Sequence, residues 1–510
     1  MSTLISDFMG DELLVNLAES LVKKDSARFS HLISHKVPRD SSILVSLEFI
    51  DATSLYEIHA LKRLIGDKSS PFVPLEYLDN YGSKLPLIML ALDRTLPLAK
   101  SSHELQGFIW VLLGYFHSLF NENKEIDSII FDNTPHLPWE LCLFFVAKSL
   151  GKKVLFLRRT GLGGYIYIDE DFRPGMGNWS FSYKNVNNSL DQSLNCIETL
   201  RGLSFTKSQK NGAWPIDVRQ KETVFISILS LLRRFGFQSL ITNLRVLIKP
   251  VPNNASYATL RTSQNTVLAG LGQISRWQYL KIHFKYQGII KKLRKFYFNI
   301  ADRVDDIKKH PYIYVALHYQ PERTTMPEGG WFENQLLMID ALSRALPNNL
   351  RIVVKEHPRQ FNYDLRSMNA RSIDDYMKLS KYHNVLVAPI TMSQQELVDG
   401  CLVTVTVAGS VGWEGLLLGK PSIVFSDIWH ASCESCRYIQ SDSQIEAAII
   451  DLMGKSCEEV LDDVCSFVNK ISNYLVNGAL NSNHLRIFFG VEDRKLSEEN
   501  IVSAILQRLN

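Results

Sequence analysis

The segment Val403–Pro421 constrains the fold of this chain more than any other. It opens with alternating valine and threonine, V-T-V-T-V, and such a short β-branched run predicts a buried strand over Val403–Val407. After a Gly-Ser turn, an apolar stretch predicts a helix over Ser410–Leu418, with Ser410 at its N-cap and Gly419 at its end. A strand that turns through small residues into a helix presents backbone N–H groups that can bind phosphate. An ordinary βα unit without a ligand has the same pattern, so the surrounding segments must distinguish the two.

Strands and helices alternate regularly around this segment. The alternation predicts a doubly wound parallel sheet that is covered by helices on both faces. The expected strands are Tyr312–Leu317, Arg351–Lys355, Val385–Ala388, Val403–Val407 and Ser422–Phe425. The expected helices are Glu333–Leu346, Ser372–Ser380, Ser393–Val398, Ser410–Leu418, Gln444–Met453, Glu458–Leu475 and Glu498–Leu506. We expect the last of these helices to pack back on the first half of the chain.

The first half of the chain has the same alternation and predicts a second Rossmann-like sheet. The expected strands are Ile43–Phe49, Leu85–Leu92, Ile126–Phe131, Val154–Leu157 and Tyr165–Ile168. The expected helices are Glu12–Lys24, Phe108–Phe120, Leu141–Leu150, Thr223–Phe235 and Phe237–Ile248. Residues 175–212 are polar and rich in Asn and Ser, which indicates a loop or an insertion between them.

A basic helix is expected over residues 274–302, where lysine and arginine are interspersed with aromatic residues. It is interpreted as an amphipathic helix that links two domains and has a solvated cationic face. The alternative is a surface that holds the protein at anionic lipid head groups. The domain plan is therefore an N-terminal Rossmann-like domain over residues 1–303, a second Rossmann-like domain over 304–480, and a C-terminal helix within 481–510.

Composition narrows the functional classes. The chain has 510 residues and is 45% hydrophobic, enough for two or more cores. Its net charge of +3 gives no argument for a nucleic-acid partner. Seven scattered cysteines are typical of reduced thiols, and Cys433 and Cys436 lack a second pair that would complete a metal site. Because the sequence starts without a signal-peptide pattern and its longest apolar run, Phe108–Phe120, is too short to span a bilayer, we expect a cytoplasmic protein, at most peripheral at the inner face of the plasma membrane.

Polar clusters follow three of the expected strands of the second sheet. They are H-Y-Q-P-E at His318–Glu322, K-E-H-P at Lys355–Pro358, and the Gly-Ser turn with Glu414 in the helix that follows it. Because the carboxyl ends of parallel strands meet at one sheet edge, where ligands bind in such folds, these clusters predict a binding cleft.

These motifs resemble those of bacterial capsule and surface-polysaccharide glycosyltransferases of the GT-B fold. The resemblance is to enzymes that use CMP-activated ulosonic acids, namely the Kdo transferases and more distantly the bacterial sialyltransferases. It covers Tyr312–Ile428 well and Ile126–Phe172 moderately, through F-D-N-T-P-H-L-P-W-E. It implies two Rossmann-like domains that face each other across a cleft. It also implies that the His357-Pro358 pair and Ser410 hold the donor phosphate, and that Gln320-Pro321 corresponds to the family's Gln-Pro element.

The residue chemistry agrees with a CMP-sugar donor. Its single phosphate can be neutralised by a histidine, a hydroxyl and a helix N-terminus, so no metal and no cofactor beyond this co-substrate is expected. Asp169-Glu170-Asp171 is the nearest candidate for a metal site, but a solvated strand end or an acceptor loop is favoured. Lys355 either adds charge at the phosphate or pairs with Glu356, and Glu414 either accepts from the ribose or favours the helix N-terminus. The predicted nucleotide-binding residues are Gln320, Lys355, His357, Pro358, Gly409, Ser410, Val411, Gly412 and Glu414.

The reacting carboxylate is expected in the N-terminal domain, opposite the nucleotide. An inverting transfer needs a base for the acceptor hydroxyl, and a retaining one needs a carboxylate nucleophile. Asp132 directly follows the strand Ile126–Phe131, with His136 and Glu140 nearby. A carboxylate that only caps the following helix would give the same pattern. Glu322, in the second domain, is a further catalytic candidate.

The sequence therefore predicts a glycosyltransferase that moves an ulosonic acid, with Kdo the expected sugar, from a CMP-sugar to a capsule or lipopolysaccharide glycan. Its expected partners are the nucleotide-sugar and a glycan or glycolipid acceptor, with a membrane surface at residues 274–302 as the alternative interpretation of the basic helix, and no nucleic acid. One alternative is a GT-B enzyme that uses a UDP-sugar or a CDP-polyol. The other is a non-catalytic subunit of a polysaccharide synthase that keeps the fold.

Overall fold

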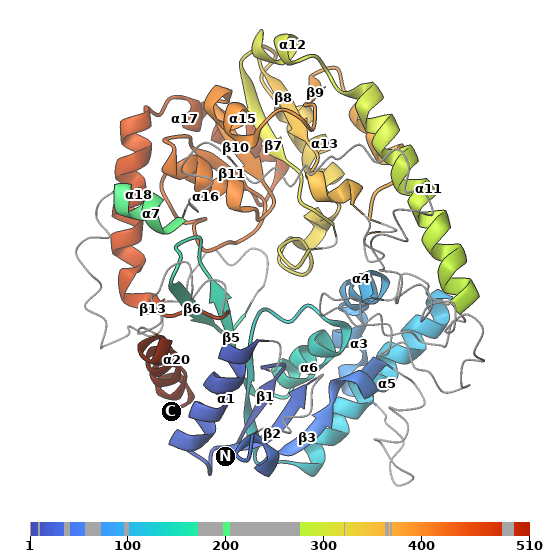
Figure 1. The fold of residues 1–510 in the computed structure, drawn as a ribbon, viewed down its shortest axis with the longest axis vertical. Coiled ribbons are helices and arrows are strands. Elements are labelled where there is room, and N and C mark those ends of the chain that lie inside the picture. Colours follow the sequence, from blue (N-terminus) through green and yellow to red (C-terminus); the bar gives the residue numbers. More distant parts are fainter. Residues whose placement is uncertain are drawn as a thin grey trace, which may run out of the picture.

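The computed structural model describes residues 2–8, 11–34, 41–56, 73–95, 101–171, 197–204, 276–320, 322–362, 367, 370–481 and 494–510. These residues form two sheet units, which lie one above the other in Figure 1. Each unit contains a Rossmann-like parallel sheet with helices packed on it, and the two face each other. The predicted α/β fold of the GT-B type is thereby confirmed.

The first sheet has seven strands in the order β13-β6-β5-β4-β1-β2-β3. Strands β1 to β5 are parallel, whereas β6 and β13 are added antiparallel at one edge. Their bounds are β1 Ser2–Ser6, β2 Phe29–Ser34, β3 Glu48–Asp51, β4 Ile126–Phe131, β5 Lys153–Arg159, β6 Tyr165–Asp169 and β13 Val476–Asn477.

Helices cover both faces of this sheet because successive strand residues point to opposite faces. Ile129 packs in the core under α4 (Leu85–Thr95), α5 (Ser102–Glu122) and α6 (Pro138–Ser149), whereas Ile130 packs in the core under α1 (Glu12–Lys24) and α20 (Arg494–Leu509). Helix α20 lies against α1, and Arg494 forms an ion pair with Glu12 at 3.0 Å. The two ends of the chain therefore lie on the same unit (Figure 1).

The second sheet has six parallel strands in the order β12-β11-β10-β7-β8-β9. Their bounds are β7 Tyr312–Ala316, β8 Arg351–Lys355, β9 Val385–Val387, β10 Val403–Thr406, β11 Ser422–Val424 and β12 Cys436–Tyr438. The helices of this unit are α12 Val304–Lys308, α13 Gln335–Ala345, α14 Ile373–Leu379, α15 Gln394–Gly400, α16 Ser410–Leu417, α17 Ile445–Met453 and α18 Cys457–Ile471. After α18 the chain returns to the first sheet through β13.

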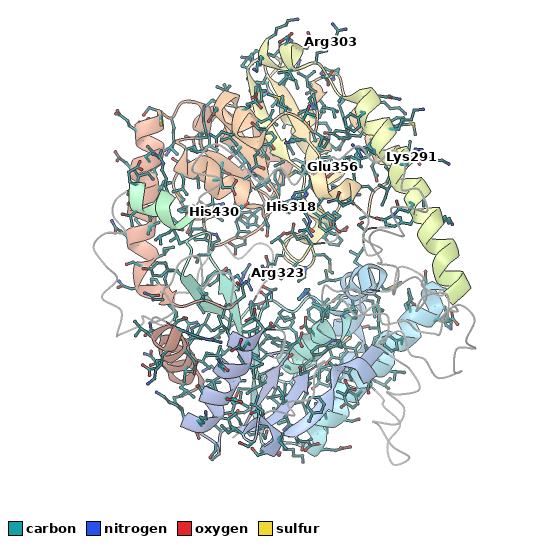
Figure 2. The ribbon with its side chains drawn as sticks, in the orientation of Figure 1. Lys291, Arg303, His318, Arg323, Glu356 and His430 are labelled. Atoms are coloured by element: carbon teal, nitrogen blue, oxygen red, sulfur yellow. The ribbon has the colours of Figure 1, made fainter. Side chains whose placement is uncertain are left out.

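The basic helix is α11, Arg276–Ile300, and it runs along one side of the molecule (Figure 1). Tyr286, Ile290, Leu293 and Tyr297 recur at helical spacing and are buried, and α11 packs on α14 and on the turn Pro358–Phe361. Lys291, Lys292, Arg294 and Lys295 are exposed on the opposite face, where Lys291 projects from the helix in Figure 2. In the described part of the chain, no helix is long and apolar enough to cross a membrane.

Three predictions of secondary structure were wrong. Leu85–Leu92 lies in helix α4 rather than in a strand, because its Leu, Met and Ala residues are strong helix formers and its proline falls in the first turn. Within Ile43–Phe49, the chain first makes a 3-10 turn, and strand β3 begins only at Glu48. Within 175–212, residues Ile197–Ser204 form helix α7. The helices expected at Thr223–Phe235 and Phe237–Ile248 lie outside the described residues.

Candidate active site

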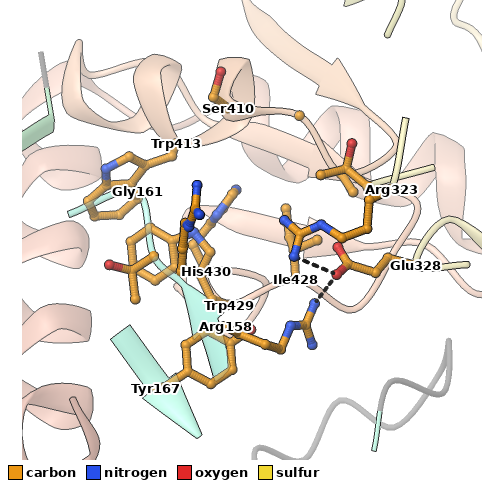
Figure 3. A pocket seen from close by; sticks show the side chains of 15 residues that line it. Arg158, Gly161, Tyr167, Arg323, Glu328, Ser410, Trp413, Ile428, Trp429 and His430 are labelled. Carbon is orange, nitrogen blue, oxygen red and sulfur yellow. Dashed lines mark ion pairs between the residues drawn. The ribbon is translucent and has the colours of Figure 1, made fainter. Parts of the chain in front are cut away.

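A pocket of about 200 Å³ lies between the carboxyl ends of the two sheets, where ligands bind in folds of this class (Figure 3). The first unit contributes the end of β5 and the turn after it, together with Tyr167 of β6. The second unit contributes the loops after β7 and β11 and the start of α16. The lining residues are Arg158, Arg159, Thr160, Gly161, Tyr167, Arg323, Thr324, Glu328, Ala408, Gly409, Ser410, Trp413, Ile428, Trp429 and His430.

The turn into α16 forms one wall of the pocket. Gly409, rather than Ser410 as predicted, is the N-cap, and Ser410 is the first helical residue, with an exposed side chain. A Cβ atom at Gly409 would lie 2.7 Å from Thr406 Oγ1 and 3.1 Å from His318 Cε1, so only glycine fits there. Because the helix begins at the pocket, its positive dipole end and its first N–H groups are available to an anion.

His318, from the end of β7, holds this turn in place. Its Nε2 lies 2.9 Å from Thr406 Oγ1 and accepts a hydrogen bond from Ala408 N at 3.2 Å. Its Nδ1 lies 3.6 Å from the carboxylate of Glu322. Burial raises the pKa of Glu322, but the hydrogen bond and charge of His318 and the charge of His357 outweigh it, so the pKa is lowered. Glu322 is therefore ionised at neutral pH.

His357 lies at the same sheet edge, at the start of the 3-10 turn Pro358–Phe361. Its Nδ1 accepts a hydrogen bond from Arg359 N at 3.2 Å, so a neutral ring carries its proton on Nε2. Burial lowers the pKa of His357; the charges of Glu356 and Glu322 oppose this shift, and those of Arg359 and His318 add to it. The ring is therefore a neutral hydrogen-bond donor at pH 7.

The side chains of Lys355 and Gln320 form hydrogen bonds within the protein. Lys355 Nζ donates to the carbonyl of Met392 at 2.5 Å, so neither of its two predicted roles is observed, and burial lowers its pKa to about 8. The amide of Gln320 donates to Thr325 Oγ1 at 2.8 Å within the loop that follows β7. Glu356 pairs instead with Arg371 at 2.9 Å and accepts from Tyr376 at 2.9 Å.

Three predicted residues of α16 lie behind the turn. Val411 is buried in the core, and a Cβ atom at Gly412 would lie 2.9 Å from Ser422 Oγ, so Gly412 serves close packing. Glu414 is 8% exposed and accepts a hydrogen bond from Gln394 at 2.7 Å. Burial raises the pKa of Glu414 to about 7, against the hydrogen bonds from Ser410 and Gln394.

The three candidates after β4 have different environments. The carboxylate of Glu140 accepts from the backbone N–H groups of His136 at 2.8 Å and Leu137 at 2.9 Å, so it caps helix α6, and His136 Nδ1 lies 3.3 Å from it. Asp132 is half-buried. Burial and the charges of Asp7 and Glu140 raise its pKa well above the ordinary value, whereas two arginines of the pocket act against them. Among these three candidates, Asp132 is the one on which the charges of Arg159 and Arg323, two residues of the pocket, act.

The residues that join the two units were not predicted from the sequence. Arg158 lies 3.0 Å from Asp169 and 3.4 Å from the buried carboxylate of Glu328, and Arg323 lies 3.7 Å from Glu328. The ion pairs of Glu328 are drawn in Figure 3, and Arg323 also donates to Asn133 of the first unit. The motif R-R-T-G after an expected strand could have indicated Arg158 and Arg159. Nothing local in the sequence indicated Glu328.

A second group that was not predicted lies at the other end of the pocket. The rings of Trp413 and Trp429 lie 4.5 Å apart between centroids, and His430 lies beside both. Both ring nitrogens of His430 are buried without a hydrogen-bond partner among the described residues, and burial lowers its pKa to about 3. A Cβ atom at Gly161 would lie 2.5 Å from Trp413 Cδ1, so the first unit closes against this aromatic end.

The predicted site residues thus divide into two groups. Gly409 and Ser410 line the pocket, and His357 and Glu322 are coupled electrostatically at the same sheet edge. The other predicted residues support the loops around it. Among the described residues, no group of three His, Cys, Asp or Glu side chains is placed to hold a metal ion. In the run Asp169-Glu170-Asp171, Asp169 pairs with Arg158, and Asp171 lies 3.7 Å from Lys148.

No family model matches the sequence, and no curated protein matches it significantly. Among solved structures, the β-Kdo 2,7-transferase KpsC of Thermosulfurimonas dismutans is 11% identical with a TM-score of 0.28, over 82% of this chain and 95% of that one. A UDP-GlcNAc 2-epimerase of Methanocaldococcus jannaschii in complex with UDP-GlcNAc and UDP is 10% identical with a TM-score of 0.25, over 92% and 99%. An Escherichia coli trehalose-6-phosphate structure with UDP-2-fluoro glucose is 10% identical with a TM-score of 0.30, over 97% and 99%. Because these TM-scores are low, the function of this chain is argued from its own residues.

Proposed function

We propose that this protein is a glycosyltransferase that moves an ulosonic acid, with Kdo the expected sugar, from a CMP-sugar onto a growing surface glycan. One observation carries the proposal: the start of α16 and an arginine-lined wall face one pocket between the carboxyl ends of two Rossmann-like sheets. The pocket is therefore suited to an anionic nucleotide donor on one side and to an acceptor on the other.

The donor phosphate is assigned to the start of α16 and to His357. The first N–H groups of α16 supply hydrogen bonds, the hydroxyl of Ser410 supplies one when it turns from Glu414 to the phosphate, and the neutral ring of His357 supplies another from Nε2. Such donors stabilise the negative charge that develops on the leaving CMP phosphate. The residues present thus support departure of a single phosphate without a metal.

Asp132 is the proposed reacting carboxylate. In an inverting transfer, it takes the proton of the acceptor hydroxyl while the acceptor oxygen bonds to the anomeric carbon and the bond from that carbon to the phosphate oxygen breaks. In a retaining transfer, it attacks the anomeric carbon first. Its raised pKa supports the role of base, because a carboxylate with a higher pKa accepts a proton more readily than an ordinary one. NMR of the product anomer distinguishes the two courses.

The test is a thermal-unfolding panel with CMP, CDP, UMP, UDP and GDP, each with and without magnesium, followed by turnover of CMP-Kdo. Binding to the folded state raises the melting temperature by mass action. We expect a magnesium-independent rise with CMP. A rise in melting temperature with UDP alone would indicate a UDP-sugar donor in place of a CMP-ulosonic acid. No rise with any nucleotide would support a non-catalytic subunit.

His357→Ala should weaken CMP binding and slow turnover by about 10-fold to 1000-fold, because it removes one donor to the leaving phosphate. His383→Ala is the matched control, since His383 is exposed. Equal CMP affinity in the two variants would remove His357 from the site.

The exposed cations of α11 support a contact with anionic lipid head groups. Co-sedimentation with vesicles containing phosphatidylserine tests this contact. Replacing Lys291, Lys292, Arg294 and Lys295 with glutamine should abolish the binding, and binding that survives would refute it.

A further inference from the structure

The pocket has a cationic wall that the phosphate site does not use. Arg158 and Arg159 end strand β5 of the first unit, and Arg323 enters from the loop after β7 of the second unit. All three line the pocket, and Figure 3 shows Arg158 and Arg323 on either side of Glu328. This wall and the start of α16 belong to different loops, so the pocket has two separate positions that attract an anion.

The carboxylates of the wall neutralise only part of its charge. Arg158 is satisfied by Asp169 at 3.0 Å and Glu328 at 3.4 Å. Glu328 is also paired with Arg323, at 3.7 Å, so it is shared between two cations. In the described part of the chain, no ion pair is formed by Arg159, and its side chain is exposed. Among the described residues, Arg159 therefore has no ion-pair partner, and Arg323 has only a share of Glu328 and a hydrogen bond to Asn133.

The electrostatics of Arg159 agree with an unfilled anion site. Although the side chain of Arg159 reaches solvent, the surrounding protein partly desolvates it and lowers its pKa; the like charge of Arg323 lowers it further, whereas Asp132 and Asp11 act in the opposite direction. Two guanidinium groups that repel each other beside a pocket are stabilised by an anion between them. Arginine suits this task because its planar donors bind carboxylates and phosphates in pairs.

We infer that Arg159 and Arg323 bind a second anionic group of the donor, and that this group is the carboxylate of the ulosonic acid. The inference rests on the proposed function, which supplies a donor with one phosphate and one sugar carboxylate. In an ulosonic acid, the carboxylate is bonded directly to the anomeric carbon. Holding it at these arginines therefore places the reacting carbon near Asp132, on which both arginines act electrostatically.

The other end of the pocket fits the rest of the sugar. Trp413 and Trp429 offer apolar ring faces, and the neutral ring of His430 has one donor and one acceptor without partners among the described residues. A buried polar group without a partner is costly, so a ligand hydroxyl or a bound water is expected there. The same cationic wall could instead bind the second phosphate of a nucleoside diphosphate, and the experiment separates these two sources.

The experiment measures dissociation constants of CMP, CDP and a CMP-ulosonic acid, by titration calorimetry, for the wild type and for Arg159→Gln. Arg159→Lys tests whether charge without a paired donor suffices. Arg303→Gln is the matched control, because Arg303 is exposed and lies just before α12, far from the pocket in Figure 2. Thermal unfolding of each variant without ligand checks that it is folded.

We expect Arg159→Gln to weaken CMP-ulosonic acid binding by about 10-fold to 100-fold, as for a lost charge-assisted pair, and to leave CMP binding within about 3-fold. Arg159→Lys should lie between, and Arg303→Gln should match the wild type. Equal loss for CMP and the CMP-sugar would overturn the inference, because Arg159 would then hold the nucleotide phosphate. Loss for CDP alone would assign the wall to a second phosphate and overturn the carboxylate assignment. If Arg159→Gln binds CMP, CDP and the CMP-ulosonic acid as the wild type does, the inference is overturned and the proposed function stands. If the wild type binds neither CMP nor the CMP-sugar, the proposed function itself is refuted.

Discussion

Glu328 is the residue whose neutralisation should most weaken the contact between the two units. Its carboxylate is buried, at 6% exposure, and accepts a hydrogen bond from Thr134 Oγ1 at 2.6 Å. It also pairs with Arg158 at 3.4 Å and Arg323 at 3.7 Å. Burial raises the pKa of Glu328, but the two arginines and Thr134 outweigh it, so the pKa is lowered and the group is ionised at neutral pH. Glu328→Gln keeps the shape and the Thr134 contact but removes the charge.

The expected loss follows from these distances. At an effective dielectric constant of about 20, each ion pair at this separation contributes about 5 kcal/mol of Coulomb energy. The desolvation of the buried carboxylate cancels much of that sum. Removing one partner of a buried pair typically costs about 3–5 kcal/mol, because the other charge stays buried. Since Arg158 keeps Asp169 at 3.0 Å and Arg323 keeps Asn133, we expect the lower end, about 3 kcal/mol.

The assay is urea unfolding followed by circular dichroism, with the first transition compared between variants because a chain of two units need not unfold in one step. Glu434→Gln is the matched control, since Glu434 pairs with Lys470 at 3.2 Å with both side chains more than 60% exposed. Such surface pairs contribute little. If Glu328→Gln and Glu434→Gln unfold at the same urea concentration, the network does not hold the units together.

Three further predictions test the site. Asp132→Asn should abolish transfer while CMP still binds, and normal transfer would exclude Asp132 as the reacting carboxylate. Gly409→Ala should destabilise the protein by about 1–3 kcal/mol and weaken CMP binding, because its Cβ atom would press on His318, whereas Gly288→Ala, which meets no atom within 4 Å, should not destabilise it. Glu414 has a pKa of about 7 in the folded protein and 4.5 in the unfolded chain. Between these two values the folded protein binds a proton that the unfolded chain has released, so the free energy of unfolding falls as the pH rises from about 4.5 to 7. The total is about 3 kcal/mol, and Glu414→Gln should remove this slope from a plot of unfolding free energy against pH.

Much of the fold could be predicted because its strands are buried in parallel sheets. Ile126–Phe131 and Arg351–Lys355 have the predicted bounds, since short β-branched runs between turn residues form such strands. Strands β1 and β2 were missed. Strand β2, F-S-H-L-I-S, contains two serines and a histidine, a composition that does not indicate a buried strand. His31 is nevertheless buried, at 2% exposure. Burial of a polar side chain depends on partners that one segment does not contain.

Some features of the candidate site could likewise be predicted from the sequence, and others could not. The positions of Gly409, Ser410 and His357 at one sheet edge could be predicted because they follow strands of one sheet, whose carboxyl ends necessarily meet at one edge. The contact of Arg158 with Glu328 could not, because it depends on how two sheets dock, and their residues are 170 positions apart along the chain. Glu140 and Lys355 were predicted to take part in catalysis or binding because a sequence shows where a charged residue lies along the chain. It does not show which group that residue contacts, and for the same reason it does not show the contact of Arg158 with Glu328.

The docking of the two units also affects the ionisation of Asp132, the proposed reacting carboxylate. Asp132 belongs to the first unit, in which burial and the charges of Asp7 and Glu140 raise its pKa and the charge of Arg159 lowers it. Arg323 comes from the second unit and lowers the pKa of Asp132, and it reaches the first unit through Asn133. Docking therefore adds a second positive charge that favours the ionised carboxylate, at the place where the donor is proposed to bind. A donor carboxylate at Arg159 and Arg323 would compete for that charge, raise the pKa of Asp132 and strengthen it as a base only once the donor is bound.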